Sequence, residues 1–312
     1  MQPRTGGKLR TFVQDLRKNR VYLCLLIPAM SYVLIFSYTP MVGVIMAFKR
    51  YNFAQGLFDS PWVGLNNFKF LVASNKLWPL TRNTLLYNIA FIVVGIVMEV
   101  GFAVIINEMR CKWFKKIFQS FIFLPYFISW VIVGVMAFNI FSSDYGFLNR
   151  LIETFGGTPI KFYTTPKAWP FILVFFNVWK GIGYGSVMYL AAIMGIDTSI
   201  YEAARIDGAN VFQRIFKVTI PMIMPTTIIL LLLSVGGIFK GNFDMFYNLV
   251  GSNGLLYNYT DVIDTLTFRA LISSNDFGMS AAVGLYQSVL CFITVVIVNK
   301  LVGLYDKDYT LF

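Results

Sequence analysis

Long apolar runs separated by short polar segments are the main pattern of this chain. Six of these runs have about 20 residues or more, which is the length that an α-helix needs to cross the hydrocarbon layer of a membrane. The pattern therefore predicts an all-α, polytopic membrane protein with one transmembrane domain over 21–303. The six expected helices cover about 21–48, 83–107, 117–141, 169–194, 226–247 and 278–302.

The distribution of lysine and arginine predicts which ends of these helices lie inside the cell. The segment 1–20 has six basic residues and one acid, Asp15. Because basic flanks stay in the cytoplasm, we expect a cytoplasmic N-terminus, together with a cytoplasmic loop over 195–225 and a cytoplasmic tail over 304–312. This topology puts 15 of the 26 basic residues inside, nine outside and two within helices.

Composition supports a membrane location and excludes several other classes. The chain of 312 residues is 57% hydrophobic and 13% charged, with a mean hydropathy of +0.66. Its net charge of +11 is explained by attraction to anionic lipid headgroups, so no nucleic acid partner is expected. The chain has no histidine, and Cys24, Cys111 and Cys291 are isolated, so we expect neither a metal site nor a catalytic centre.

The polar segment within 195–225 is predicted to form two short helices outside the hydrocarbon. Ser199 and Glu202 have the spacing of a capping box at the start of the first helix. Gly208 is expected to end that helix in the left-handed conformation, and Asn210 is expected to cap the second helix. Two short helices joined by a glycine turn, or glycine elbow, can provide a docking surface for a partner protein.

This segment also resembles the cytoplasmic signature loop of binding-protein-dependent ABC importer permeases. That motif reads Glu-Ala-Ala, three residues, Gly, nine residues, Ile, any residue, Leu and Pro. Here it is matched by Glu202–Ala204, Gly208 and Val218–Pro221, with valine for isoleucine and isoleucine for leucine as conservative differences. The resemblance implies the type I importer permease fold. It also implies that an ATP-hydrolysing subunit docks on Glu202, Ala203, Ala204, Arg205, Asp207 and Gly208.

A second run, Trp62–Phe68 (WVGLNNF), resembles the sugar-importer branch of the same family. The two resemblances together imply a permease subunit for oligosaccharide uptake in the cytoplasmic membrane of a prokaryote. The implied partners are a second permease subunit, two ATP-binding-cassette subunits and an extracytoplasmic solute-binding protein. No Walker-type GxxxxGK[ST] sequence occurs in the chain, so ATP and Mg are expected on partner subunits and the chain itself is not expected to be an enzyme.

Polar residues at membrane depth are candidates for the solute pathway, because they are costly there and usually face a cavity or another helix. One group surrounds Lys180, about 16 Å along the fourth helix, and another lies in the fifth helix. The predicted pathway residues are Asn177, Trp179, Lys180, Tyr184, Lys240, Asn242, Asp244 and Tyr247. The structural alternative is that Lys180 pairs with an acid on another helix, that Lys240 and Asp244 neutralise each other on one helix face, and that nearby glycines serve close packing.

Several other functions remain open at this point. The solute of an ABC permease can also be an amino acid, a peptide or an anion, and two lysines at membrane depth make an acidic sugar worth testing. A polytopic membrane enzyme would need paired carboxylates, a histidine or a metal site, and none stands out. A secondary transporter would show inverted repeats, and no halves of matching pattern are present.

Overall fold

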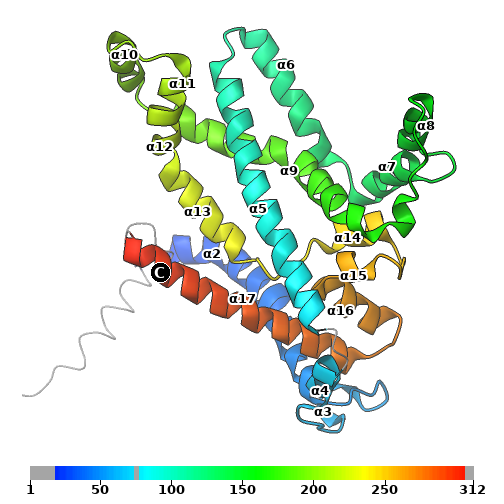
Figure 1. Ribbon diagram of the computed structural model, residues 1–312. Helices are drawn as coiled ribbons and strands as arrows, with labels where there is room; N and C mark the ends of the chain where they lie inside the picture. Colours follow the sequence, from blue (N-terminus) through cyan, green and yellow to red (C-terminus); the bar gives the residue numbers. More distant parts are fainter. Residues whose placement is uncertain (1–17, 74–76, 306–312) are drawn as a thin grey trace, which may run out of the picture.

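The computed structural model describes residues 18–73 and 77–305, which are helical except for loops and two isolated backbone bridges (Figure 1). Within these residues, four segments are long and apolar enough to cross a membrane, and two further pairs of helices meet the same test but are bent. The predicted all-α membrane fold is confirmed, and six spans result when each bent pair counts as one. The four straight candidates are Arg20–Phe48, Leu77–Glu108, Pro166–Met194 and Phe277–Leu304.

The first span is helical throughout but changes its type of helix along its length. It consists of α2 (Arg20–Val33), a π-helical turn η1 (Leu34–Tyr38) and a 3₁₀ segment η2 (Thr39–Phe48). Pro40 lies at the start of η2 and has no backbone N–H, so it cannot donate the regular α-helical hydrogen bond. No residue of α2 is buried within this chain.

The prediction of one continuous third helix over 117–141 is wrong. The chain forms α6 (Lys112–Phe123), the 3₁₀ turn η3 (Leu124–Phe127) and α7 (Trp130–Phe141). The two arms meet at 98°. Pro125 lies in the turn, and the Ser129 side chain accepts the backbone N–H of Ile132 to start α7. A proline followed by a helix-capping serine explains why the chain turns here.

The fifth predicted helix, 226–247, is wrong in its second half. The structure has α13 (Met224–Val235), a non-helical stretch over 236–242, and α14 (Phe243–Val250). Gly236, Gly237 and Gly241 disfavour helix, and Asn242 accepts the backbone N–H of Met245 to cap α14. The 12 residues of α13 extend only about 18 Å, and they follow the helical segment Val211–Met222 across a bend of 55°.

The remaining elements connect or extend these spans. Figure 1 shows α10 and α11 at one end of the molecule and α3 and α4 at the opposite end. The long spans include α5 (Leu77–Glu108), α9 (Trp169–Met194) and α17 (Phe277–Tyr305). The short elements are α3 (Gly56–Asp59), α4 (Asn66–Ala73), α8 (Phe147–Thr154), η4 (Phe162–Thr164), η5 (Pro166–Ala168), α10 (Thr198–Ile206), α11 (Val211–Arg214), η6 (Ile215–Thr219), α12 (Ile220–Met222), α15 (Tyr257–Thr260) and α16 (Ile263–Ile272).

Helices α5 and α9 form the most extensive helix pair in the described chain. Apolar side chains are buried in three clusters, one around Trp169, one around Ala282 and one around Tyr189. The indole N–H of Trp169 donates to the carbonyl oxygen of Phe162 over 2.9 Å, so the large ring is buried with its polar atom satisfied.

The Trp62–Phe68 run has a structural role at the ends of the first and last spans. The side-chain amide of Asn67 donates to the carbonyl oxygens of Ala47 at 2.9 Å and Lys49 at 3.0 Å. These carbonyls end the first span and have no helical partner. Gly278 lies against the same amide, because a Cβ at this position would fall 2.6 Å from the Asn67 nitrogen. The run thus ties the first span to the start of α17.

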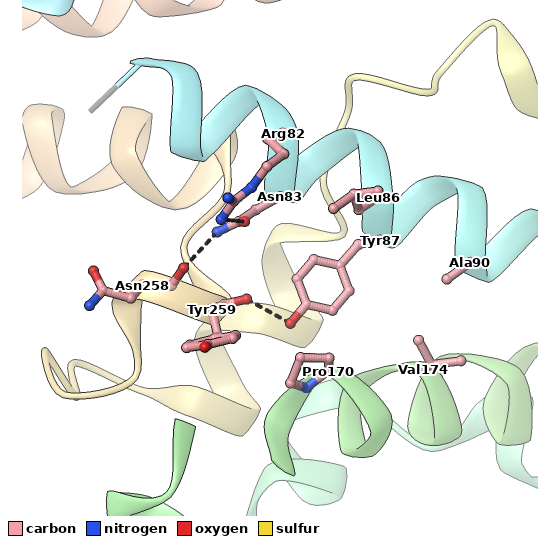
Figure 2. A pocket seen from close by; sticks show the side chains of 9 residues that line it. All are labelled: Arg82, Asn83, Leu86, Tyr87, Ala90, Pro170, Val174, Asn258 and Tyr259. Carbon is pink, nitrogen blue, oxygen red and sulfur yellow. Dashed lines mark hydrogen bonds between the residues drawn. The ribbon is translucent and has the colours of Figure 1, made fainter. Parts of the chain in front are cut away.

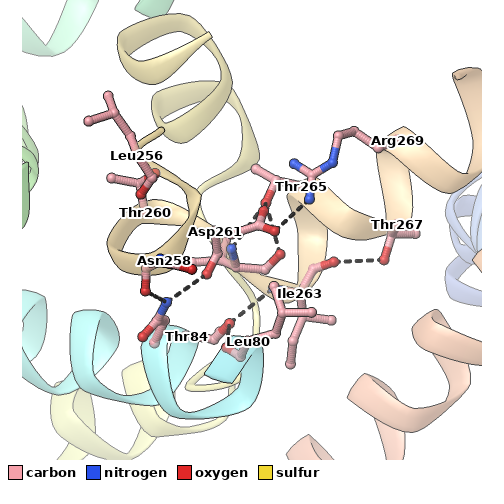
Figure 3. Close-up of polar contacts among 12 residues, drawn as sticks. Leu80, Thr84, Leu256, Asn258, Thr260, Asp261, Ile263, Thr265, Thr267 and Arg269 are labelled. Carbon is pink, nitrogen blue, oxygen red and sulfur yellow. Dashed lines mark hydrogen bonds and ion pairs between the residues drawn. The ribbon is translucent and has the colours of Figure 1, made fainter. Parts of the chain in front are cut away.

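The loop between α14 and α17 is held against α5 by hydrogen bonds (Figure 3). Asn83 of α5 donates to the carbonyl oxygens of Asn258 and Asp261, each at 3.2 Å. Thr84 accepts the backbone N–H of Ile263 at 3.1 Å. Asp261 also forms an ion pair of 2.5 Å with Arg269. These contacts fix α15 and α16 beside the start of α5.

Candidate functional site

The loop with the signature motif begins with a cap that differs from the predicted one. Asp197, not Ser199, is the N-cap of α10, and its carboxylate accepts the backbone N–H of Ser199 at 2.9 Å. The proposed capping box of Ser199 and Glu202 is therefore wrong, because the helix already begins at Thr198. The hydrogen bond from the Ser199 backbone lowers the pKa of the exposed Asp197 carboxyl.

The glycine elbow and the second cap are present as predicted. Gly208 has a φ of +79°, in the left-handed region that glycine tolerates. The backbone N–H of Ala209 donates to the carbonyl oxygen of Ala204 at 2.9 Å, which is the six-residue closure of a Schellman motif. Asn210 and Gln213 then accept each other's backbone N–H groups, both at 2.8 Å, to start α11.

Two contacts tie this loop to the rest of the protein, and the sequence did not point to either. The hydroxyl of Tyr201 on α10 lies 3.0 Å from the hydroxyl of Thr219 in η6. Arg214 of α11 lies 3.8 Å from Glu108, the last residue of α5. The two contacts anchor α11 to the end of α5 and α10 to the segment leading into α13.

The predicted docking residues form an open surface. Glu202, Ala203, Arg205, Asp207 and Gly208 are exposed, and Ala204 is half-buried. Ile206 and Phe212 lie beside them with 86% and 72% of their surfaces exposed. We call Glu202, Arg205, Ile206, Asp207 and Phe212 the coupling surface. Its combination of exposed apolar and charged groups is typical of a protein interface.

Lys180 is held by backbone groups of the broken third span. Its ammonium donates to the carbonyl oxygens of Pro125 at 3.3 Å and Tyr126 at 2.6 Å. It also lies 5.6 Å and 5.5 Å from the ring centres of Tyr126 and Trp130, within cation–π range. The alternative that Lys180 pairs with an acid is wrong for the described residues, because neither ion pair found there involves it.

Two glycines near Lys180, Gly183 and Gly185, serve close packing, as the structural alternative held, but Gly181 has open space around it. A Cβ at Gly183 would fall 2.6 Å from the Cα of Phe123 and still closer to the carbonyl oxygen of Ile122. The turn of the third span therefore rests directly on the backbone of α9. One turn after Lys180, the ring of Tyr184 stacks on that of Tyr126 at 4.9 Å, with 49% and 42% of these residues exposed.

Tyr126, Trp130 and Tyr184 thus form an aromatic platform around the Lys180 ammonium. Tyr126 and Trp130 were missed in the sequence, since they precede Lys180 by about 50 residues and no local pattern connects them. The other two predicted residues of α9 face the core. The Asn177 amide lies 3.8 Å from the Met245 sulfur, and Trp179 packs on the buried cluster around Trp169.

The four predicted residues near α14 do not all share a helix face. Lys240 lies in the non-helical stretch, so its spacing of four from Asp244 has no helical meaning, and the two do not form an ion pair. Asn242 is used as a helix cap. Asp244 and Tyr247 are exposed, and the Tyr247 ring stacks on Phe243 at 5.3 Å.

Gly237 and Gly241, which are spaced as in a helix-packing GxxxG motif, lie in the non-helical stretch, and Gly241 makes a different contact. The backbone N–H of Gly241 donates to the Asp264 carboxylate at 2.5 Å, and a Cβ on Gly241 would fall 2.7 Å from the same oxygen. Gln287 of α17 donates to this oxygen at 2.8 Å. Burial raises the pKa of the Asp264 carboxyl, while these two donors oppose the rise.

A cavity of about 600 Å³ lies between the starts of α5 and α9 and the short helix α15 (Figure 2). Its lining is mostly apolar along α5 and α9 and polar where α15 approaches. The lining residues are Arg82, Asn83, Leu86, Tyr87, Ala90, Pro170, Val174, Asn258 and Tyr259. Within the described residues, no group of three or more histidine, cysteine, aspartate or glutamate side chains is arranged to hold a metal ion.

The chain is similar in sequence to a family of transport proteins and to individual permeases. The profile of the family described as "Binding-protein-dependent transport system inner membrane component" matches residues 92–303. The chain is 34% identical to Protein LplB of Bacillus subtilis (strain 168) over 97% of its own length and 95% of that protein. It is 31% identical to the polygalacturonan/rhamnogalacturonan transport system permease protein YteP of the same organism, over 96% and 92% of the two chains.

Solved structures show the same similarity in three dimensions. One is a bacterial alginate ABC transporter in complex with an alginate pentasaccharide-bound periplasmic protein. The chain matches it with a TM-score of 0.83 and 31% identity, over 92% of this chain and 95% of that one. The other is a bacterial ABC transporter involved in the import of the acidic polysaccharide alginate, with a TM-score of 0.84 and 30% identity over 93% and 98%. At this identity and coverage, the similarity extends through all of the spans.

Proposed function

Because the chain belongs to the family of binding-protein-dependent transport system inner membrane components, we propose that it is the permease subunit of an ATP-driven importer of oligosaccharides. The observation that carries this proposal is the match to permeases of sugar importers over nearly the whole chain, in sequence and in structure. The anchored loop of α10 and α11 supports it, since an importer permease must pass the motion of a separate ATPase to its membrane helices.

In the proposed complex, two ATP-binding-cassette subunits bind ATP and Mg and dock on the coupling surface. Glu202, Arg205 and Asp207 make no side-chain hydrogen bond or ion pair within the described chain, so their charges are free for a partner. The N-terminus and the loop then lie in the cytoplasm of a prokaryotic cell. A second permease subunit completes the pathway, and a solute-binding protein delivers the solute at the outer face.

The proposed mechanism is alternating access. ATP-driven closure of the ATPase subunits pulls on α10 and α11. The contacts of Tyr201 with Thr219 and of Arg214 with Glu108 carry this motion to η6 and α5. Rigid-body shifts of the spans then open the pathway to one side of the membrane and close it to the other. This chain contributes docking and transmission, and the bond cleavage of ATP takes place on its partners.

We further propose that the solute is an acidic oligosaccharide. The relatives include a polygalacturonan/rhamnogalacturonan permease and importers of alginate. In the aromatic platform Tyr126 and Tyr184 are exposed and Trp130 is half-buried, and exposed aromatic rings suit the stacking of sugar rings. Lys240 adds a positive charge that is exposed within this chain. Asp244 and Tyr247, which are exposed, complete the proposed pathway set, while Asn177 and Trp179 pack in the core and Asn242 caps α14.

The test is a tagged purification of the chain from its native membrane in mild detergent, followed by mass spectrometry of the co-purifying proteins. We expect an ATP-binding-cassette subunit and a second permease, and loss of the ATPase when Glu202 and Gly208 are replaced. A matched control is Gly254→Ala, a glycine of the outer loop with open space around it. Recovery of the chain alone would overturn the importer proposal.

The solute class is tested separately, by uptake of labelled oligogalacturonides and of neutral arabino-oligosaccharides into cells that produce the complete transporter. Preferential uptake of the oligogalacturonides supports an acidic solute. Uptake of only the neutral series contradicts the acidic solute but leaves the importer proposal intact, so the two parts fail independently.

A further inference from the structure

The cavity in Figure 2 changes in character along its length. Leu86 and Ala90 form its wall on α5, and Pro170 and Val174 form its wall on α9. Within each pair the residues are four apart, so each pair faces the cavity from one side of its helix. These walls carry no polar side-chain atom, and the long part of the cavity is therefore an apolar groove between two membrane spans.

The polar residues of the cavity gather at one mouth, beside α15. Two of them are already used by the protein, because the Asn83 amide donates to backbone carbonyls of the loop and the Tyr87 hydroxyl donates to the carbonyl oxygen of Tyr259 at 2.7 Å. The Arg82 guanidinium contacts only the side-chain oxygen of Asn83, at 3.2 Å, and no carboxylate lies within ion-pair distance of it among the described residues. The side-chain amide of Asn258 is exposed. The mouth therefore presents an uncompensated cation.

The polar mouth and the apolar walls of the groove are expected at depths that correspond to the headgroup and the acyl chains of a membrane lipid. The end of α5 near Glu108 contacts Arg214 of α11, in the segment expected in the cytoplasm, so we expect the start of α5 at Leu77 to lie at the opposite membrane surface. Arg82 is then about 8 Å from that end of α5 and Ala90 about 20 Å, at 1.5 Å per residue. By this count we expect the guanidinium at headgroup level and the apolar walls in the hydrocarbon region.

From this arrangement we propose that the groove between α5 and α9 binds an anionic phospholipid. One acyl chain lies along Leu86, Ala90 and Val174, and the phosphodiester binds the Arg82 guanidinium, whose fork of N–H groups suits phosphate oxygens. A saccharide fits less well, because its hydroxyl groups would lose water against walls that offer no hydrogen bond. The site is independent of the solute pathway and of the importer proposal.

The test is native mass spectrometry of the full chain with its co-purifying partners, released from nanodiscs that contain phosphatidylcholine and phosphatidylglycerol. We expect wild type to retain phosphatidylglycerol. Arg82→Gln should lower its occupancy about tenfold, as expected for one lost charge-assisted contact. Ala90→Phe fills the groove and should remove the lipid while leaving the cation in place.

Two matched variants serve as controls. Lys167→Gln removes an exposed cation just before α9, and Ile89→Phe enlarges an exposed neighbour of Ala90, and neither residue lines the cavity. Both should retain the lipid at the wild-type level. Failure of wild type to retain phosphatidylglycerol, or equal retention by all four variants, overturns the proposal. So does displacement of the lipid by an oligogalacturonide, because it would identify the groove as a saccharide site.

Discussion

The ammonium nitrogen of Lys180 lies 2.6 Å from the carbonyl oxygen of Tyr126. This carbonyl belongs to the turn where the third span bends by 98°, so the hydrogen bond satisfies a backbone group that helix geometry leaves open. A lysine in a membrane span is thus explained by a break in the neighbouring span. The sequence made the Lys180 ammonium a candidate for binding the solute, but in the structure it already binds backbone carbonyls of this chain.

Replacing Lys180 by methionine should therefore impair uptake of acidic and neutral oligosaccharides to the same extent. The substitution keeps most of the side-chain volume but removes the hydrogen bond to the Tyr126 carbonyl, whereas the Pro125 carbonyl keeps the backbone N–H of Ile128. Loss of one hydrogen bond of this kind costs about 0.5–1.5 kcal/mol. Uptake of both solute series should be measured beside Lys161→Met, an exposed lysine of the loop before α9. Selective loss of the acidic series would instead show that Lys180 contacts the solute.

Gly183→Ala should destabilise the protein, whereas Gly181→Ala on the same helix should not. A Cβ at position 183 meets the backbone of Ile122 and Phe123, which cannot move independently of the turn, but a Cβ at position 181 meets nothing within 4 Å. Overpacking of this kind costs about 1–3 kcal/mol. Thermal unfolding of the two variants in the same detergent gives the comparison, and equal midpoints would contradict the close contact of α9 with the third span.

Gly208→Ala should weaken the docking of the ATPase without disturbing the spans. Position 208 has space for a methyl group, but its φ of +79° is unfavourable for alanine, by about 1–2 kcal/mol. We expect about tenfold weaker retention of the ATPase subunit, with an unchanged unfolding midpoint of the membrane domain. Gly208→Asn should lie between alanine and wild type, because asparagine tolerates this conformation better. An alanine variant that retains the ATPase fully would show that the elbow is not needed for docking.

Tyr201 and Thr219 should behave as a coupled pair in a double-mutant cycle. Tyr201→Phe removes one hydroxyl of the 3.0 Å contact, and Thr219→Val removes the other. Each single change should cost about 0.5–1.5 kcal/mol, and the double variant should cost less than the sum, because the shared contact is lost only once. The readouts are the unfolding midpoint and the ATP consumed per solute imported. Tyr145→Phe, with its exposed ring on the outer loop, is the matched control, and additive losses would contradict the coupling.

Local features of the fold could be predicted because local chemistry determines them. The length of each apolar run predicts a membrane span without reference to the rest of the chain. The glycine elbow at Gly208 and the cap at Asn210 depend on hydrogen bonds that reach only a few residues. The cap at Asp197 was missed because Ser199, two residues later, offered an equally good local pattern.

The failures share a different physical cause. The breaks near Pro125 and over 236–242 lie inside runs that are apolar enough to continue as helix. Proline and glycine disfavour helix at these points, but further contacts that stabilise the broken forms come from distant parts of the chain. The Tyr126 carbonyl of the first break accepts the Lys180 ammonium, and the N–H of Gly241 in the second donates to Asp264. No periodicity within one segment carries information about such partners.

The sequence by itself determined that this protein spans a membrane and belongs with importer permeases, because hydropathy and a motif of about 20 residues are properties of continuous segments. Only the tertiary structure decided what the polar residues within those segments contact. It placed the Lys180 ammonium on the turn of another span, assembled the aromatic platform, and opened the groove between α5 and α9. Each of these depends on the packing of helices far apart in the chain, and that packing is set by the complementary shapes of side chains and not by the pattern within any one helix.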